Sequence, residues 1–115
     1  MTFLTVLKMI AALATAATGL LALINPVSIH GFTGLSADNA RGISEIRAIF
    51  GGLFIALGIA PFLFGKPAYM VLGFGYLAIA AVRMVSILID HSTASSNWIS
   101  LAIEIVLGIV LMLRG

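Results

Sequence analysis

AAVRMVSILID, residues 80–90, decides the fold, because it places Arg83 inside an apolar run that ends at an aspartate. A charged side chain at the middle of a membrane helix costs about 2.5–3.5 kcal/mol on insertion scales. The chain is 62% hydrophobic and 9% charged, whereas a soluble domain carries about 25% charged residues. This composition is typical of integral membrane proteins, so Arg83 is expected to need a partner on a neighbouring helix.

Outward from this stretch, four segments are long enough to cross a hydrocarbon core of about 30 Å. They cover residues 4–24, 43–64, 68–89 and 98–113. Lys8 lies within the first run rather than before it, which favours a retained helix over a cleaved signal peptide. The predicted fold class is an all-α integral membrane protein, an up-down-up-down four-helix bundle in which residues 1–115 form a single domain.

The few basic residues predict an orientation. With four spans both termini lie on one side, and Lys8, Lys66 and Arg114 fall on that side, against Arg41 in the opposite loop. Cytoplasmic loops carry an excess of Lys and Arg. We therefore expect cytoplasmic termini and a location in the inner (cytoplasmic) membrane of a bacterium.

The intramembrane charges are predicted to cluster. Arg83 lies seven residues before Asp90, and Glu104 lies seven residues after Asn97. Seven helical residues rise about 10 Å, so both charges lie at one depth. The predicted charge cluster and possible ligand site contains Glu45, Arg47, Arg83 and Glu104, with Arg83 held by Glu104 and then by Glu45. Arg47 is two residues from Glu45, so one of the two is expected to face away from the cluster.

Two further patterns at helical spacing accompany the cluster. Polar side chains form a supporting stripe that comprises Tyr76, Ser86, Asp90 and Ser100. Small residues allow membrane helices to approach closely, and those expected at such contacts are Gly51, Gly52, Ala56 and Gly108.

The stretches SEIRAIFGGLFIALG (44–58), AVRMVSILID (81–90) and EIVLGIVLML (104–113) resemble a bacterial family of four-span proteins described as a domain of unknown function. The family is similar to the broader DoxX-like membrane proteins. The resemblance covers nearly the whole chain and rests most on Glu45, Arg47, Gly51 and Gly52. It implies a four-span fold and a charge constellation, but no activity.

Several function classes are not expected. The sequence has no cysteine, so disulfides and thiolate metal sites are excluded. A net charge of +2 does not suit a nucleic-acid partner. No cofactor, no metal site and no enzymatic activity are predicted, because no catalytic or nucleotide-binding motif is present. His30 and His91 are interpreted as interfacial side chains, with a haem or pigment ligand as the open alternative.

Three functions remain open. The first is an accessory or structural subunit that associates with a larger membrane complex or with itself as a homo-oligomer. The second is a module that binds a lipid headgroup, a quinone or another small polar group at the charge cluster. The third is a proton-coupled small-molecule transporter. For a subunit, the charge cluster is interpreted as structural, since buried ion pairs can fix one helix arrangement. For a binding module or a transporter, it is interpreted as the functional site.

Overall fold

The computed structural model describes residues 2–113, which are mostly helical and contain no strand. The elements in chain order are α1 (Phe3–Ile24), η1 (Pro26–Ile29), α2 (His30–Thr33), α3 (Ala40–Glu45), η2 (Ile46–Leu53), α4 (Phe54–Phe64), α5 (Lys66–Asp90) and α6 (Ser95–Met112). Four stretches are long and apolar enough to cross a membrane: Phe3–Ile24, Ala40–Phe64, Lys66–Asp90 and Ser95–Met112. The predicted all-α, four-span fold is confirmed, with span boundaries within three residues of those expected.

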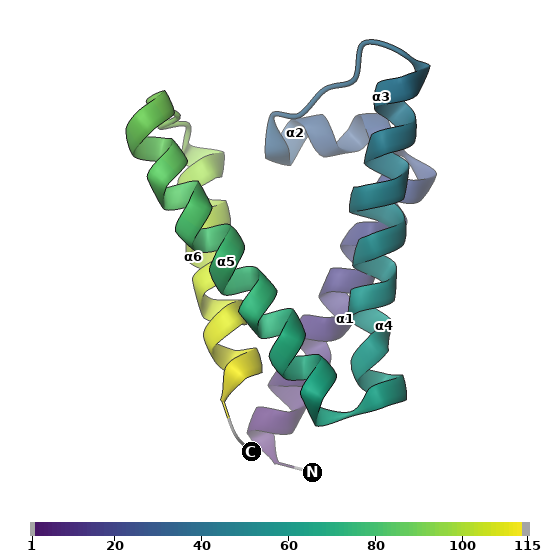
Figure 1. Cartoon of the computed structure of the whole chain (residues 1–115), viewed down its shortest axis with the longest axis vertical. Coiled ribbons are helices and arrows are strands. Elements are labelled where there is room, and N and C mark those ends of the chain that lie inside the picture. Colours follow the sequence, from purple (N-terminus) through teal and green to yellow (C-terminus); the bar gives the residue numbers. More distant parts are fainter. Residues whose placement is uncertain (1, 114–115) are drawn as a thin grey trace.

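The four spans form two pairs that diverge like the arms of a V (Figure 1). One pair consists of α1 packed along η2 and α4, and the other consists of α5 packed along α6. The two pairs meet at the end that holds the termini and the turn between α4 and α5 (Figure 1). We call this the closed end. The opposite, open end carries residues 25–39 and 91–94, and α2 lies across it.

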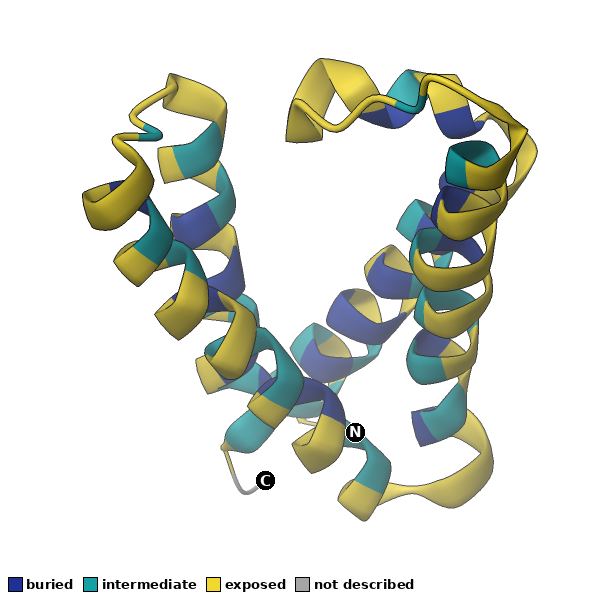
Figure 2. Ribbon diagram, turned by 45° about the horizontal axis from the view of Figure 1, so that its top comes forward, coloured by how far each residue is buried: buried dark blue, intermediate teal, exposed yellow. Residues whose placement is uncertain are grey.

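The buried residues lie within each helix pair and at the place where the two pairs meet (Figure 2). One apolar cluster, with Ala11, Leu72 and Leu111 among its members, joins the two pairs near the closed end. The other two clusters lie towards the open end, one within each pair. Within residues 2–113, the halves of the two pairs nearest the open end therefore share no buried apolar cluster.

Small residues set the contact between α1 and the second span. A Cβ on Gly58 would lie 2.5 Å from the backbone nitrogen of Ala16, and a Cβ on Gly19 would lie 2.7 Å from the carbonyl oxygen of Gly51. Such distances leave room only for hydrogen, so the two backbones touch at these glycines. The buried face of α1 consists of Lys8, Ala11, Ala12, Thr15, Gly19 and Ala22.

Two of the four predicted packing residues do not lie at helix contacts. Gly51 is buried against α1, but Gly52 and Ala56 are exposed. The reason is η2, a π-helix in which each turn holds more residues than an α-helical turn. The change of pitch rotates the following residues, so Gly58 faces α1 in place of Ala56.

The second pair packs through the predicted Gly108. A Cβ there would lie 2.6 Å from the side chain of Leu77 and 3.2 Å from the carbonyl oxygen of Gly73. The close approach brings α5 and α6 together along their length, which places Arg83 and Glu104 on facing sides of one helix pair.

Candidate functional site

Arg83 of α5 and Glu104 of α6 form a bidentate ion pair. The Arg83 Nε donates to Glu104 Oε1 over 2.7 Å, and Nη2 donates to Oε2 over 2.7 Å. The fork geometry of a guanidinium matches a carboxylate in this way, and a lysine would not reproduce it. The predicted partner of Arg83 is therefore present. The Glu104 side chain is 11% exposed, whereas that of Arg83 is 31% exposed, so the cation is the more accessible half of the pair.

Asn97 is the third member of the site. Its Oδ1 accepts a hydrogen bond of 2.8 Å from Arg83 Nη1, and its Nδ2 donates to the carbonyl and hydroxyl oxygens of Ser92. Asn97 thus ties the guanidinium to the loop between α5 and α6. Asn97 was not among the predicted site residues, although its spacing of seven residues from Glu104 places both on one face of α6.

The predicted four-residue cluster does not form. Glu45 pairs with Arg41, one helical turn away, and both side chains are more than half exposed. Arg47 is exposed and forms no ion pair among residues 2–113. Both residues belong to the second span, which diverges from α5 and α6 towards the open end, so the prediction that Glu45 is the second partner of Arg83 is wrong.

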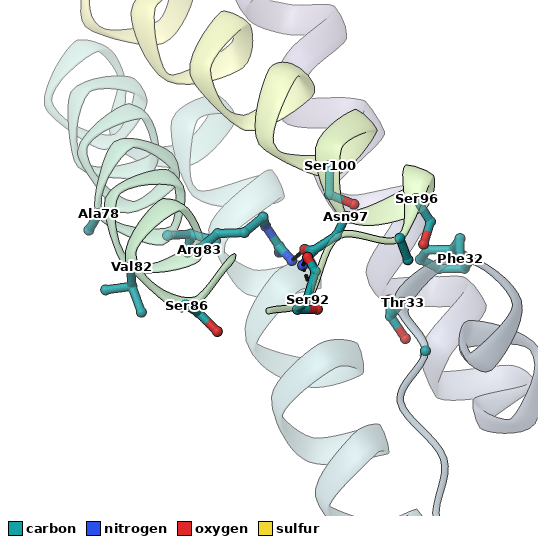
Figure 3. A pocket seen from close by; sticks show the side chains of 13 residues that line it. Phe32, Thr33, Ala78, Val82, Arg83, Ser86, Ser92, Ser96, Asn97 and Ser100 are labelled. Carbon is teal, nitrogen blue, oxygen red and sulfur yellow. Dashed lines mark hydrogen bonds between the residues drawn. The ribbon is translucent and has the colours of Figure 1, made fainter. Parts of the chain in front are cut away.

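A cleft of about 790 Å³ lies beside the Arg83–Glu104 pair at the open end. Figure 3 shows Arg83 pointing towards Asn97 and Ser92, with Phe32 and Thr33 of the α2 segment on the other side. The cleft is lined by Phe32, Thr33, Gly34, Ala78, Ile79, Val82, Arg83, Ser86, Ser92, Ala94, Ser96, Asn97 and Ser100. It therefore combines one guanidinium, one amide and several hydroxyl groups with an apolar α5 wall.

The site has free hydrogen-bond donors but no net charge. A guanidinium carries five N–H groups, and Arg83 uses three of them in bonds to Glu104 and Asn97. The hydroxyls of Ser96 and Ser100 form no hydrogen bond with the rest of the described chain, whereas Ser86 donates to Asp90. Because Glu104 neutralises Arg83, the cleft offers donors without an uncompensated cation.

The family model described as "Domain of unknown function (DUF4345)" matches residues 3–114. The chain belongs to the DUF4345 family. It matches no curated protein and no solved structure. The matched range contains all four spans and every residue that lines the cleft, so the cleft lies wholly within the DUF4345 domain.

The predicted polar stripe is divided between two places in the DUF4345 domain. Ser86, Asp90 and Ser100 lie at the open end, where Ser86 and Ser100 line the cleft. Tyr76 lies lower on α5, and its hydroxyl group is hydrogen-bonded to that of Thr15 on α1. This bond is one of the few polar contacts between the two helix pairs.

Replacing Asn97 with leucine is expected to lower the free energy of unfolding of the DUF4345 chain by about 1–3 kcal/mol, the usual cost of leaving a hydrogen-bonding partner unsatisfied. The change removes the amide that bridges Arg83 to Ser92. Thermal unfolding in detergent, followed by circular dichroism, measures the effect. Ser95→Ala is the matched control, because Ser95 is exposed and makes no side-chain hydrogen bond with the described residues. Equal midpoints for the two variants would contradict the role given to Asn97.

Proposed function

We propose that this protein is a membrane-embedded binding module, whose cleft holds the polar group of a small lipid-like molecule. One observation carries the proposal: the Arg83 guanidinium is fixed by Glu104 and Asn97, yet it faces a cleft of about 790 Å³ with two N–H groups unused. A purely structural ion pair needs no such cavity beside it. The volume is within the range of about 300–1,000 Å³ usual for small-molecule sites.

The polar group is neutral and accepts hydrogen bonds. An anion at Arg83 would compete with Glu104, which already occupies the fork of the guanidinium with both carboxylate oxygens. Separating that pair would leave a carboxylate without its partner in a largely apolar setting, which is costly. A carbonyl, ether or hydroxyl oxygen can accept from the unused Arg83 N–H groups and from Ser100 without disturbing the pair.

An accessory or self-associating subunit is the second candidate. It is favoured by the V shape, since the halves of the two helix pairs nearest the open end share no core among the described residues. A second polypeptide would supply that missing contact. We do not propose a proton-coupled transporter, because its carboxylate must release its partner to titrate, and Glu104 is held through both oxygens.

We also propose a membrane location and an orientation for the protein. Four spans, with Lys8 beside Leu113 and Lys66 at the start of α5 near the closed end and Arg41 at the start of α3 near the open end, support an inner (cytoplasmic) membrane location with both termini in the cytoplasm. The cleft would then open towards the outer side of that membrane. In this setting the available partners are membrane lipids. We also propose that the family is related to the DoxX-like membrane proteins.

Native mass spectrometry of protein extracted gently from its host membrane tests the function. Wild-type protein is expected to carry a small molecule, and Ser100→Leu is expected to reduce its occupancy at least roughly tenfold, which corresponds to about 1.4 kcal/mol. The added side chain occupies cleft space beside Arg83 and removes a hydroxyl donor. Ala102→Leu adds similar bulk at an exposed position of α6 that does not line the cleft, and it should leave occupancy unchanged.

Two outcomes would overturn this function. A spectrum in which wild-type protein carries no small molecule but binds another polypeptide at fixed ratio would make the chain an accessory subunit. A bound mass that survives Ser100→Leu as well as it survives Ala102→Leu would place the ligand outside the cleft.

A further inference from the structure

A second cavity lies below the polar cleft, towards the closed end. Its volume is about 240 Å³, and it is open on one side, where the lining residues Val71 and Phe74 are exposed. It is lined by Thr15, Phe54, Leu57, Val71, Leu72, Phe74, Gly75, Tyr76 and Ile79, which come from α1, α4 and α5. It therefore lies between the two helix pairs, where they begin to diverge (Figure 1).

This lower cavity offers no free hydroxyl donor from its two hydroxyl-bearing residues. The Thr15 hydroxyl donates its one proton to the carbonyl oxygen of Ala11. In its bond with Tyr76, Thr15 must therefore accept, so the Tyr76 proton is also used. The remaining lining side chains are hydrocarbon. The lower cavity is thus suited to a hydrocarbon group, in contrast to the donor-rich cleft above it.

The two cavities share a wall. Ile79 lines both of them, and one face of α5 continues from the lower cavity into the cleft through Gly75, Ile79 and Arg83 at helical spacing. Eight residues separate Gly75 from Arg83, a rise of about 12 Å. Along α5, the hydrogen-bond donors of the cleft are therefore followed by the hydrocarbon walls of the lower cavity. An amphiphile has the same order, a polar head followed by a hydrocarbon chain.

We propose that the ligand is a neutral amphiphile with one hydrocarbon chain, a specification that rests on the proposed function. Its head accepts hydrogen bonds from Arg83 and Ser100, and its chain passes Ile79 into the lower cavity. The lower cavity holds less than the usual minimum of about 300 Å³ for a drug-sized group, so it admits one slender chain rather than two. The intact Arg83–Glu104 pair selects a neutral head over a carboxylate.

Gly75 gives a direct means of closing the lower cavity. A Cβ added at Gly75 would meet no atom within 4 Å, although the residue lines the cavity. The first carbon of a Gly75→Leu side chain therefore has open space at the cavity wall, and leucine is also the better helix former. Ala81→Leu is the control on the same helix, because Ala81 is exposed and lines neither cavity.

The experiment is a titration of the purified protein with monoacylglycerols that carry octanoyl, lauroyl or palmitoyl chains, followed by native mass spectrometry, with laurate as the anionic comparison. For wild-type protein and Ala81→Leu, affinity should rise from octanoyl to lauroyl and gain no more at palmitoyl, because a palmitoyl chain is too large for a cavity of about 240 Å³. Monolauroylglycerol should bind more tightly than laurate. Gly75→Leu is expected to lower the lauroyl affinity at least roughly tenfold and to abolish the rise from octanoyl to lauroyl. Ser100→Leu is expected to lower the affinity for all three chains by a similar factor.

The outcomes separate the two proposals. If Ser100→Leu weakens binding but Gly75→Leu behaves as Ala81→Leu, the polar site stands and the chain-binding cavity is wrong. If neither variant weakens binding, both proposals fail. If no monoacylglycerol binds, the single-chain amphiphile is wrong, and the small molecule carried from the host membrane still decides the proposed function. Tighter binding of laurate than of monolauroylglycerol would overturn the neutral head. A dimer that excludes every amphiphile would assign the space between the pairs to a second copy of the chain.

Discussion

Replacing Glu104 with alanine is expected to lower the free energy of unfolding by about 3–5 kcal/mol, the usual cost of removing one partner from a buried ion pair. The reason is that Arg83 loses both carboxylate contacts, and Asn97 alone stays bonded to it. Unfolding in mixed detergent micelles with increasing dodecyl sulfate measures the change. Ala102→Leu, on the exposed side of α6, is the control and should leave the unfolding curve unchanged.

The double variant Arg83→Met with Glu104→Leu makes this test specific. Two apolar side chains leave no unpaired charge, and such replacements are often neutral or stabilising. The double variant should therefore unfold later than Glu104→Ala and later than Arg83→Met alone. A loss below about 1 kcal/mol for Glu104→Ala, the level of an exposed pair, would show that the ion pair does not hold α5 to α6.

Replacing Gly58 with alanine should have the second largest effect, a loss of about 1–3 kcal/mol in the free energy of unfolding or somewhat more. The added Cβ would lie 2.5 Å from the nitrogen of Ala16 and 2.6 Å from the carbonyl oxygen of Ala12. Both atoms belong to the backbone of α1, so no side chain can rotate away and the helices must separate. Thermal unfolding in detergent reports the loss.

Gly75→Ala is the matched control for this substitution. Both glycines lie within membrane-spanning helices, and alanine raises helix propensity at each position. At Gly75 the new methyl group has open space, so stability should be equal to or above that of the wild type. If the two alanine variants unfold together, α1 and α4 do not touch as closely as the structure indicates.

The Arg83–Glu104 pair could be predicted from the sequence because two independent conditions agree on it. Each charge needs neutralising inside a span, and both lie seven residues from the same end of the membrane. Gly108 could be predicted for a similar reason, since small residues at helical spacing mark close contacts. These inferences depend only on regular helix geometry, which α5 and α6 follow.

The failed predictions have two physical causes. Glu45 could not be placed correctly because helical periodicity gives a residue's depth and face but not the angle between helix pairs, and the divergence of the pairs separates it from Arg83. Gly52 and Ala56 were misplaced because η2 departs from the α-helical pitch. The lower cavity had no sequence signal, since it depends on the spacing of α1, α4 and α5, which helical periodicity does not give.

The divergence of the two helix pairs also makes the molecule a wedge. The pairs meet at the closed end and separate at the open end, so the chain spreads over more area at one membrane surface than at the other (Figure 1). A bilayer that accommodates many such wedges in one orientation must give its two leaflets unequal areas. The lowest-energy shape of that bilayer is then curved, with the open end of each molecule on the convex side.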